Sequence, residues 1–434
     1  MNNLHDSYTI LLPLYKEAEI VDKLIQAMID LVYPKKLLQI LILLEADDKE
    51  TIDAISQKKL PPYFSILIVP DHGPKTKARA CNYGLEHATG KYLVIYDAED
   101  IPETDQLLVA VQTFKKHNDP ELACLQAKLT FYNHSENLLT KLCTLEYLVH
   151  FNFILPGFSE NGVPVPLGGT SNHFKLQALR KIHGWDAYNV TEDADITYRL
   201  SRKNYKIKML DSYTSEETVI DVKSWIKQRS RWVKGHIITF LVQSRTGFPK
   251  HQNNGAKCIF SLYYFIGLSS AISLSIPFLI VLFISYLFNS TNISEKIAPV
   301  TKYIFLFYCM LWVYCTLIIP LFLIHKEQKP FLFKVCFLYP FYLLLYTMPF
   351  CYALFQLLFK PHYWEKTAHG KSSVKVIPHI TKGRMRHKEI IKSKKGVKKW
   401  QRYTVSFTLV FIAWNSKVYP YKRWIATPTV VGLQ

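Results

Sequence analysis

Short apolar runs alternate with amphipathic stretches over the first half of the chain. Five runs of seven or eight residues are mostly apolar: "YTILLPL", "LQILILLE", "FSILIVP", "KYLVIYD" and "LACLQAK". Runs of this kind are typical of strands buried on both faces of a largely parallel sheet. Between the first two runs, residues 17–32 place six aliphatic side chains on one helical face and end at "YP". Repeated strand–helix–strand units predict an α/β layered domain that ends near Arg245.

The hydropathy pattern changes after Arg245. Residues 258–288, 303–324 and 335–359 contain no charged side chain, and each run reaches the about 20 residues that a helix needs to cross a bilayer. Three such runs in close succession favour membrane-spanning helices over the core helices of a soluble domain. The expected organisation is therefore a catalytic α/β domain over residues 1–245, a transmembrane helical region over 246–360, and a basic tail over 361–434.

Charge gives an orientation to this arrangement. The formal net charge is +19, and nucleic-acid binding would explain the charge but not the apolar runs, so no nucleic-acid partner is expected. The positive-inside rule places the α/β domain in the cytoplasm. Residues 360–402 contain fourteen Lys or Arg and two Glu, which predicts a cytoplasmic or interfacial segment in contact with anionic lipids. Three simple crossings would put this segment outside, so the first run, with Gly267 and Pro277, is interpreted as a hairpin or re-entrant pair.

Charged residues follow the predicted strands. The strands run into "PLYKEAE", "LEADDKET", "PDHGPKTKARACN" and "YDAEDIP", and ligands of open α/β sheets bind beyond the carboxyl ends of the strands. Carboxylates beside Lys and Arg suit a nucleotide diphosphate with a divalent cation, because hard cations prefer carboxylate and phosphate oxygens. A "D-x-D"-like triplet alone is weak evidence, since most are solvated loop carboxylates. Its position after a strand, following three similar strand ends, favours the ligand site.

These motifs, taken in order with "GGTSN", "TED" and "QRSRW", resemble those of the inverting family 2 glycosyltransferases. The resemblance is greatest to the membrane-bound branch that contains cellulose, hyaluronan and chitin synthases. It covers residues 8–235, and "HYWEKTAHG" at 362–370 resembles a further motif of a bacterial subset. It implies a GT-A nucleotide-diphospho-sugar transferase domain, with a mixed and mostly parallel sheet, followed by an α-helical transmembrane region.

For the donor, the resemblance assigns a role to each matching position. Tyr15, Glu17 and Asp47 would line a uridine pocket, and Lys77 would approach the phosphates. Asp97 and Glu99 match the D-x-D positions that hold the nucleotide and Mg²⁺ or Mn²⁺. Glu stands here where Asp is usual, and Asp100 is adjacent, so both Glu99 and Asp100 are candidate metal ligands.

For the acceptor, Asp193 of "TED" is the expected general base, and Glu192 has a capping or supporting role. Gly169 and Thr170 belong to a loop that approaches the acceptor closely. Further substrate-binding residues are Gln228, Arg231 and Trp232 of the Q-x-x-R-W motif. Lys366 and Thr367 match a segment that closes over the nucleotide, with an interfacial aromatic belt as the alternative.

The chemistry of single displacement agrees with this assignment. One carboxylate removes the proton of the acceptor hydroxyl, and a metal ion with Lys77 and Arg231 stabilises the departing diphosphate. A leaving-group acid is unnecessary because UDP departs as an anion, in contrast to glycosidases. Simpler roles stay open: Thr191 and Asp193 as a helix cap, Trp232 as a membrane-interface anchor, and "GGTSN" as an ordinary turn.

We therefore expect a multi-pass enzyme of the cell membrane that transfers sugar from a UDP-sugar to a growing β-linked polysaccharide. Processivity follows from the resemblance alone. Larger synthases carry membrane helices before the catalytic domain, whereas the first strand here begins at Tyr8, so export would require a homodimer or a partner protein. The enzymatic alternative is non-processive transfer of one sugar to a lipid acceptor. An alternative of another class is an inactive scaffold or transporter subunit.

Overall fold

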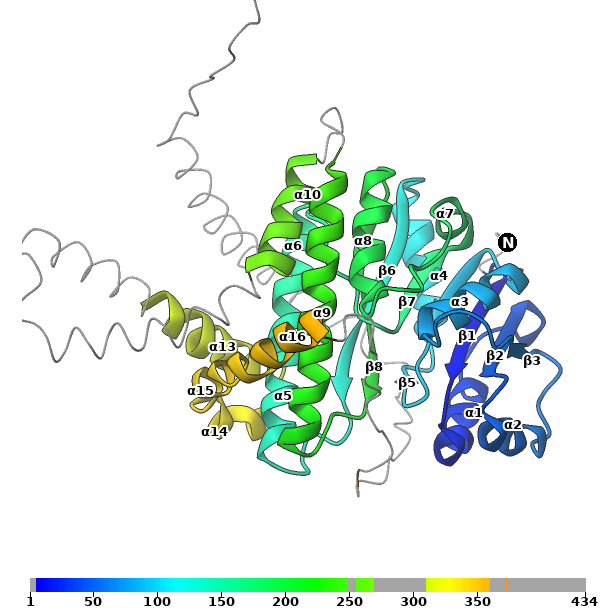
Figure 1. Ribbon diagram of the computed structural model, residues 1–434, viewed down its shortest axis with the longest axis horizontal. Coiled ribbons are helices and arrows are strands. Elements are labelled where there is room, and N and C mark those ends of the chain that lie inside the picture. The colour runs from blue at the N-terminus through cyan, green and yellow to red at the C-terminus, as the bar shows by residue number, and fades with distance from the viewer. Residues whose placement is uncertain (1–4, 249–254, 269–309, 360–371, 373–434) are drawn as a thin grey trace, which may run out of the picture. The chain divides into compact units, whose positions relative to one another are not determined.

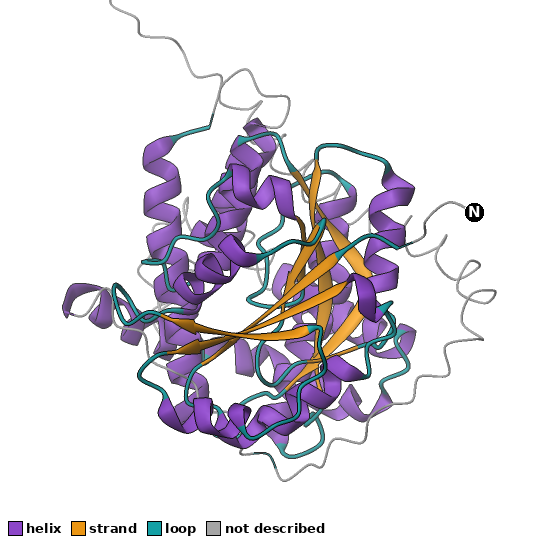
Figure 2. Cartoon of the chain, turned by 90° about the vertical axis from the view of Figure 1, so that its right-hand side faces the viewer, coloured by secondary structure: helices purple, strands orange, loops and turns teal. Residues whose placement is uncertain are grey.

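The computed structural model describes residues 5–248, 255–268, 310–359 and 372, all of which lie in one compact unit, Met1–Thr381. Within these residues the strands form one eight-stranded twisted sheet in the order β3-β2-β1-β4-β7-β6-β8-β5. Helices cover the sheet on both sides (Figures 1 and 2). The expected α/β layered architecture is confirmed.

The first four strands of the chain make the parallel half of the sheet. They are β1 (Tyr8–Leu14), β2 (Leu38–Glu45), β3 (Phe64–Val69) and β4 (Tyr92–Ile95), and each coincides with a predicted apolar run. The connecting helices are α1 (Val21–Ile29), α2 (Lys49–Ser56) and α3 (Lys77–His87). The predicted helix over residues 17–32 is shorter than expected, because it opens with a 3₁₀ turn at Ala18–Ile20 and ends at Ile29.

The second half of the sheet is mixed. Strand β7 (Asn172–Lys175) runs antiparallel between β4 and β6 (Leu122–Phe131), while β8 (Lys206–Glu216) runs parallel to β6. The short β5 (Ile101–Pro102) pairs antiparallel with β8. The hydropathy pattern did not indicate β7 or β8, because "NHFK" and "KIKMLDSYTSE" are largely polar.

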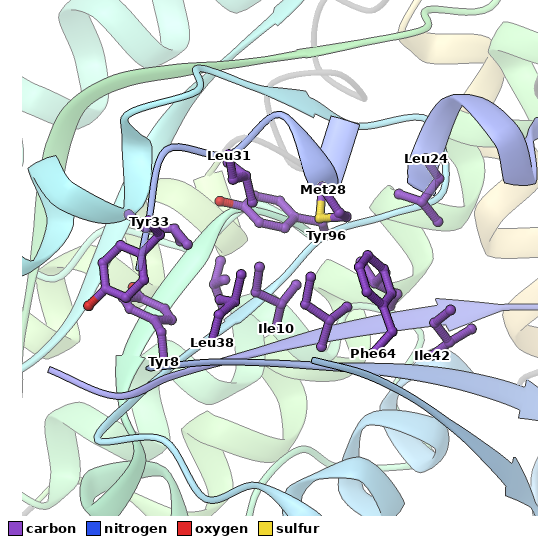
Figure 3. Packing of buried hydrophobic residues seen from close by; sticks show 14 of the residues in the cluster. Tyr8, Ile10, Leu24, Met28, Leu31, Tyr33, Leu38, Ile42, Phe64 and Tyr96 are labelled. Atoms are coloured by element: carbon purple, nitrogen blue, oxygen red, sulfur yellow. The ribbon is translucent and has the colours of Figure 1, made fainter. Parts of the chain in front are cut away.

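A hydrophobic core lies between α1 and the sheet, where Ile10 and Met28 are fully buried (Figure 3). A buried polar relay crosses the same region: the Tyr8 hydroxyl lies 2.6 Å from His173 Nδ1, and His173 Nε2 lies 3.1 Å from Gln106 Oε1. Burial lowers the pKa of His173 to about 3, so its ring is neutral. The relay fixes β7 in the middle of the sheet and therefore positions the loop that precedes it.

The remaining helices pack around the sheet and form a helical layer beside it. Their bounds are α4 (Gln106–His117), α5 (Leu138–Val149), α6 (Leu155–Glu160), α7 (Leu176–Lys181), α8 (Glu192–Arg202), α9 (Val222–Thr246), α10 (Gly255–Ser261), α13 (Ile319–Lys326), α14 (Phe333–Cys336), α15 (Tyr339–Leu344) and α16 (Thr347–Phe359). A π-helical turn, His150–Ile154, joins α5 to α6.

Within the described residues, two helical segments are long and apolar enough to span a bilayer: Leu138–Glu160 and Tyr339–Phe359. The first was not predicted as a span, and it is mostly buried in the fold; the second coincides with the predicted run 335–359 and is mostly exposed. A shorter apolar helix covers Met310–Lys326 and overlaps the predicted run 303–324. Most of the run 258–288, the motif at 362–370 and the tail from 373 lie outside the described residues. Membrane insertion therefore stays a prediction.

Candidate active site

The loop after β1 is fixed against the start of α2. Lys16 has a positive φ of 54°, and its N–H donates to Asp48 Oδ2 at 2.5 Å, while the Glu17 N–H donates to Thr51 Oγ1 at 3.1 Å. Asp48 also caps α2 by accepting from the Thr51 N–H at 3.4 Å. These bonds hold Tyr15 and Glu17 at the carboxyl edge of the sheet. The sequence analysis singled out Asp47 and missed the buried Asp48.

Asp47 faces the loop after β3. Lys75 Nζ lies 2.7 Å from Asp47 Oδ2 and 3.1 Å from Asp71 Oδ1, and the hydrogen bond from Lys75 lowers the pKa of Asp47. The buried Glu45, at the end of β2, forms an ion pair with Arg79 on α3. This ion pair was not predicted from the sequence. These ion pairs bind the loops after β2 and β3 to one another and to α3.

Lys77, the first residue of α3, links the loop after β4 to the "GGTSN" loop. Its Nζ forms an ion pair with the carboxylate of Asp97 and donates to the carbonyl oxygen of Gly169 at 2.6 Å. Burial by itself would lower the pKa of Lys77, but the charges of Asp97 and Glu192 raise it above its usual value. Lys77 is therefore a charged lysine at the centre of the predicted site.

The three acidic residues after β4 have different environments. Asp97 and Glu99 are half-buried, whereas Asp100 is 1% exposed. Asp100 accepts from the Asp97 N–H at 2.7 Å and from the Thr170 hydroxyl. Burial and the charges of Asp97 and Glu99 raise its pKa well above the usual value. Asp100 thus links the backbone of its own loop to Thr170 and stabilises the loop from within.

A further acidic residue, Glu216 at the end of β8, belongs to the same region. Burial and the charges of Asp100, Glu99 and Asp97 raise its pKa well above the usual value. Glu216 was not predicted from the sequence because β8 itself was not predicted. No group of three or more His, Cys, Asp or Glu side chains in the described part of the chain is arranged to hold a metal ion by itself.

The "GGTSN" loop reaches across the site. The Gly168 N–H donates to Gln126 Oε1 at 2.8 Å, and Gln126 Nε2 donates to the Thr170 carbonyl at 3.1 Å. A Cβ added at Gly169 would lie 3.6 Å from Asp193 Oδ2 and 3.9 Å from Lys77 Nζ. Gly169 therefore lies next to both the lysine and the carboxylate, with room for ordinary van der Waals contact.

The "TED" residues begin α8. Asp193 Oδ1 accepts from the Ala194 N–H at 2.8 Å. Burial, together with the neighbouring Glu192 carboxylate, raises the pKa of Asp193 to about 7; burial also raises the pKa of Glu192. Thr191 occupies the N-cap position, but its side chain makes no capping hydrogen bond. Asp193 is thus a carboxyl group whose proton affinity suits proton transfer near neutral pH.

The Q-x-x-R-W motif lies on α9, where Gln228 is half-buried. Burial lowers the pKa of Arg231, and the charges of Glu192, Asp97, Asp193 and Glu99 oppose this change. The Arg231 guanidinium is therefore in electrostatic reach of both acidic motifs. Trp232 packs against the buried Arg229, whose guanidinium carbon lies 4.0 Å from the ring centroid of the indole.

Helix α9 is pressed onto the segment that carries Asp193. A Cβ added at Gly235 would lie 2.5 Å from the Thr191 hydroxyl oxygen and 2.8 Å from its Cβ, and closer still to its methyl carbon. Asn189 Nδ2 donates to Thr239 Oγ1 at 2.9 Å, and Gln243 Nε2 donates to Asp195 Oδ1 at 2.5 Å. This contact brings the Q-x-x-R-W helix to the "TED" helix.

The predicted residues form two groups at the same edge of the sheet. One group surrounds Lys77 and contains Asp97, Gly169, Glu192, Asp193 and Arg231. The other holds the β1 and β2 loops and contains Tyr15, Glu17 and Asp47. Thr170 is connected to the first group through Asp100, whereas Trp232 contacts Arg229. The arrangement places the carboxyl group of Asp193 near the cationic Lys77 and Arg231.

Two family models match the chain. Residues 92–360 match "Glycosyl transferase family group 2", and residues 9–161 match "Glycosyl transferase family 2". The first match covers more than half of the chain, and together the two span both the parallel and the mixed half of the sheet.

Two curated relatives agree with these matches. The chain is 26% identical over 264 residues to the "Probable glycosyltransferase YdaM" of Bacillus subtilis, covering 59% of this chain and 61% of that protein. It is 28% identical over 234 residues to the "Poly-beta-1,6-N-acetyl-D-glucosamine synthase" of Staphylococcus epidermidis, covering 53% of this chain and 54% of that protein. The chain thus spans little more than half the length of the curated relatives it matches.

The fold is also similar to that of a mannosyltransferase from Pyrobaculum calidifontis, solved in complex with GDP-Man and Mn²⁺. The TM-score is 0.55 at 16% sequence identity, and the match covers 82% of this chain and 88% of that one. At this identity the similarity shows the fold, which is the GT-A fold expected from the sequence motifs.

Proposed function

The chain belongs to the family 2 glycosyltransferases, and from this premise we propose that it is a membrane-bound, inverting enzyme that transfers sugar from a UDP-sugar to a growing β-linked polysaccharide. The observation that carries the proposal is the grouping around Lys77. Asp97 pairs with this lysine, and Gly169 lies next to both the lysine and Asp193. A donor diphosphate and an acceptor hydroxyl would meet at this point.

Asp193 is the proposed catalytic base. An inverting single displacement needs one carboxylate close to the acceptor hydroxyl, and a pKa raised to about 7 makes that carboxylate a stronger base than an exposed aspartate. The Ala194 N–H holds one oxygen of the carboxylate and leaves the other toward Gly169. Lys77 and Arg231 would supply positive charge to the departing UDP.

Asp97 and Glu99 are the proposed metal ligands, since Asp100 is buried and engaged with Thr170 and the loop backbone. Two carboxylates fit a Mg²⁺ or Mn²⁺ ion that obtains its other ligands from the donor diphosphate and water. When bound, the ion would neutralise charge on the leaving diphosphate.

The donor base would bind between the loops after β1 and β2, at Tyr15, Glu17 and Asp47. Gly169 and Thr170 would border the acceptor, with Gln228, Arg231 and Trp232 contributed by α9 and Glu192 supporting Asp193. The name of the staphylococcal relative makes UDP-N-acetylglucosamine the first donor to test and favours a polysaccharide acceptor. A lipid-linked acceptor that receives a single sugar is the second candidate.

The proposed location is the cell membrane, with several spans and the catalytic domain in the cytoplasm. The segment Tyr339–Phe359 supports it, because Phe341, Phe355, Leu358 and Phe359 are all more than half exposed, Leu358 by 79%. Apolar side chains exposed on the consecutive helices α15 and α16 favour a lipid environment over water. A homodimer or a separate export partner would complete the path of a polymer out of the cell.

The test uses membranes that contain the full chain and a panel of labelled UDP-sugars, with UDP release measured and products sized. Polymer or a ladder supports the proposal, and a single lipid-soluble glycoside supports the second candidate. Asp193→Asn should abolish UDP release and preserve nucleotide binding, while Asp22→Asn, an exposed carboxylate paired with Lys58, serves as the matched control. Normal turnover by Asp193→Asn would refute the base assignment.

A further inference from the structure

The helix that carries the Q-x-x-R-W motif holds a partly buried ion pair outside the group around Lys77. Arg229 is 0% exposed, and its Nη2 lies 2.8 Å from Glu146 Oε2, on α5. Within the described residues, Nε and Nη1 of Arg229 have no hydrogen-bond partner. Glu146 is therefore the acceptor that fixes this guanidinium.

The guanidinium of Arg229 lies over the ring of a tryptophan. The guanidinium carbon lies 4.0 Å from the ring centroid of Trp232, a distance well within the range of a cation–π contact. Because the ion pair with Glu146 holds the guanidinium, it also holds the cation against which the Trp232 ring packs. Trp232 is half-buried and directly follows Arg231, which is in electrostatic reach of the site carboxylates.

Glu146 is held in turn by the apolar segment near the end of the described chain. The Tyr342 hydroxyl donates to Glu146 Oε2 at 2.6 Å, and the Tyr346 hydroxyl donates to Oε1. Trp225, at the start of α9, donates from Nε1 to the Tyr342 hydroxyl at 2.9 Å. Glu146 thus joins α5, α9 and the segment Tyr339–Phe359 in one buried network.

We propose that Glu146 is a positioning residue for the acceptor: through Arg229 it sets the orientation of Trp232, and the tyrosines of the segment Tyr339–Phe359 keep it in place. This inference rests on the proposed function in taking Trp232 to be the residue that contacts an acceptor sugar. Without the charge of Glu146, the buried Arg229 has no anion to face, so its guanidinium moves and the Trp232 ring loses its support. The effect falls on the acceptor side and leaves the donor pocket unchanged.

The first experiment needs no turnover. The contribution of Trp232 to the tryptophan emission is obtained as parent minus Trp232→Phe, once in the wild-type background and once with Glu146→Gln. Because a stacked cation changes the surroundings of an indole, the contribution should differ in wavelength or intensity between the two backgrounds. The same contribution in both would overturn the proposal.

The second experiment separates acceptor from donor. With UDP-N-acetylglucosamine and a short β-linked N-acetylglucosamine oligosaccharide as probes, Glu146→Gln should raise the acceptor KM about tenfold and change the donor KM less than about twofold. Glu146→Asp should recover part of the loss. Asp211→Asn, which removes the partner of Lys128 at 2.9 Å, is the control for loss of an ion pair elsewhere. Equal changes in both KM values would indicate a general structural role and overturn the proposal.

The outcomes separate this inference from the proposed function. If the wild-type chain transfers no sugar from any donor, the proposed function fails, and the emission experiment still decides whether Glu146 positions Trp232. If Glu146→Gln does not fold, Tyr346→Phe replaces it, because this change removes one hydrogen bond to Glu146 and keeps the ion pair. A smaller change of the Trp232 emission in the same direction is then expected, and no change would overturn the proposal.

Discussion

Replacing Gly235 by alanine tests whether the contact between α9 and the "TED" segment positions the base. The added methyl carbon would lie 2.5 Å from the Thr191 hydroxyl oxygen and 2.8 Å from its Cβ. Ordinary contacts of these atoms are about 3.5–4 Å, so the helix and the N-cap residue of α8 must separate by about 1 Å. Asp193 follows two residues after Thr191 and would move with it.

The expected effect on stability is small and that on activity is large. Overpacking of this kind costs about 1–3 kcal/mol, and alanine returns about 1 kcal/mol because glycine is unfavourable inside a helix. The free energy of unfolding should therefore fall by about 0–2 kcal/mol. Displacement of a catalytic group by about 1 Å can cost about 100-fold in rate. We expect kcat to fall about 100-fold while nucleotide binding is retained.

The assay is UDP release by membranes or detergent-solubilised protein, combined with thermal unfolding. Thr191→Gly removes the three nearest atoms that the new methyl group would meet, so the double variant with Gly235→Ala should recover much of the lost activity. Ser244→Ala, at an exposed position of the same helix, controls for helix propensity. Full activity of Gly235→Ala at wild-type stability would show that the two helices need not be in contact for catalysis.

The remaining predictions concern protonation and the metal. Because the pKa of Asp193 is raised to about 7, its carboxyl group is protonated below that pH and cannot act as a base. The kcat should therefore fall about tenfold per pH unit as the pH drops below about 7. A flat profile of kcat from pH 5 to 8 would contradict this prediction. Asp97→Asn and Glu99→Gln should each weaken activation by Mn²⁺ at least about tenfold, whereas Asp100→Asn, whose carboxylate is engaged inside the loop, should leave the Mn²⁺ concentration for half-maximal activity unchanged. Lys77→Met should raise the donor KM at least about tenfold, since it removes the cation next to Asp97; titration of UDP-sugar checks this, and an unchanged KM would place the phosphates elsewhere.

Strand β8 shows where prediction from the sequence reached its limit. The strands β1, β2 and β4 could be read directly because both of their faces are buried, and burial on both faces requires continuous apolar runs. Strand β3, at one end of the sheet, is also an apolar run, although its four middle residues are at least partly exposed. Strand β8 is polar at many positions, and most of its side chains are at least partly exposed. Glu216 at its end was missed for this reason.

The motifs also left the role of individual carboxylates open. Spacing alone treats Glu99 and Asp100 alike, since they are adjacent. The structure distinguishes them, because Thr170, far along the chain, donates to Asp100 and draws it inward. Likewise, Arg229 and Arg231 both belong to "QRSRW", but their partners, Glu146 for one and the site carboxylates for the other, come from different elements.

The α/β domain and the order of the motifs could be predicted from the sequence, because hydrophobic periodicity and local residue types are properties of short segments. The packing of distant segments determines which carboxylate faces the cations and which is engaged within its own loop. It also places the Thr191 side chain directly against Gly235. The physical reason is that burial and ion pairing depend on residues distant in sequence. Proton affinity and side-chain orientation follow from those neighbours.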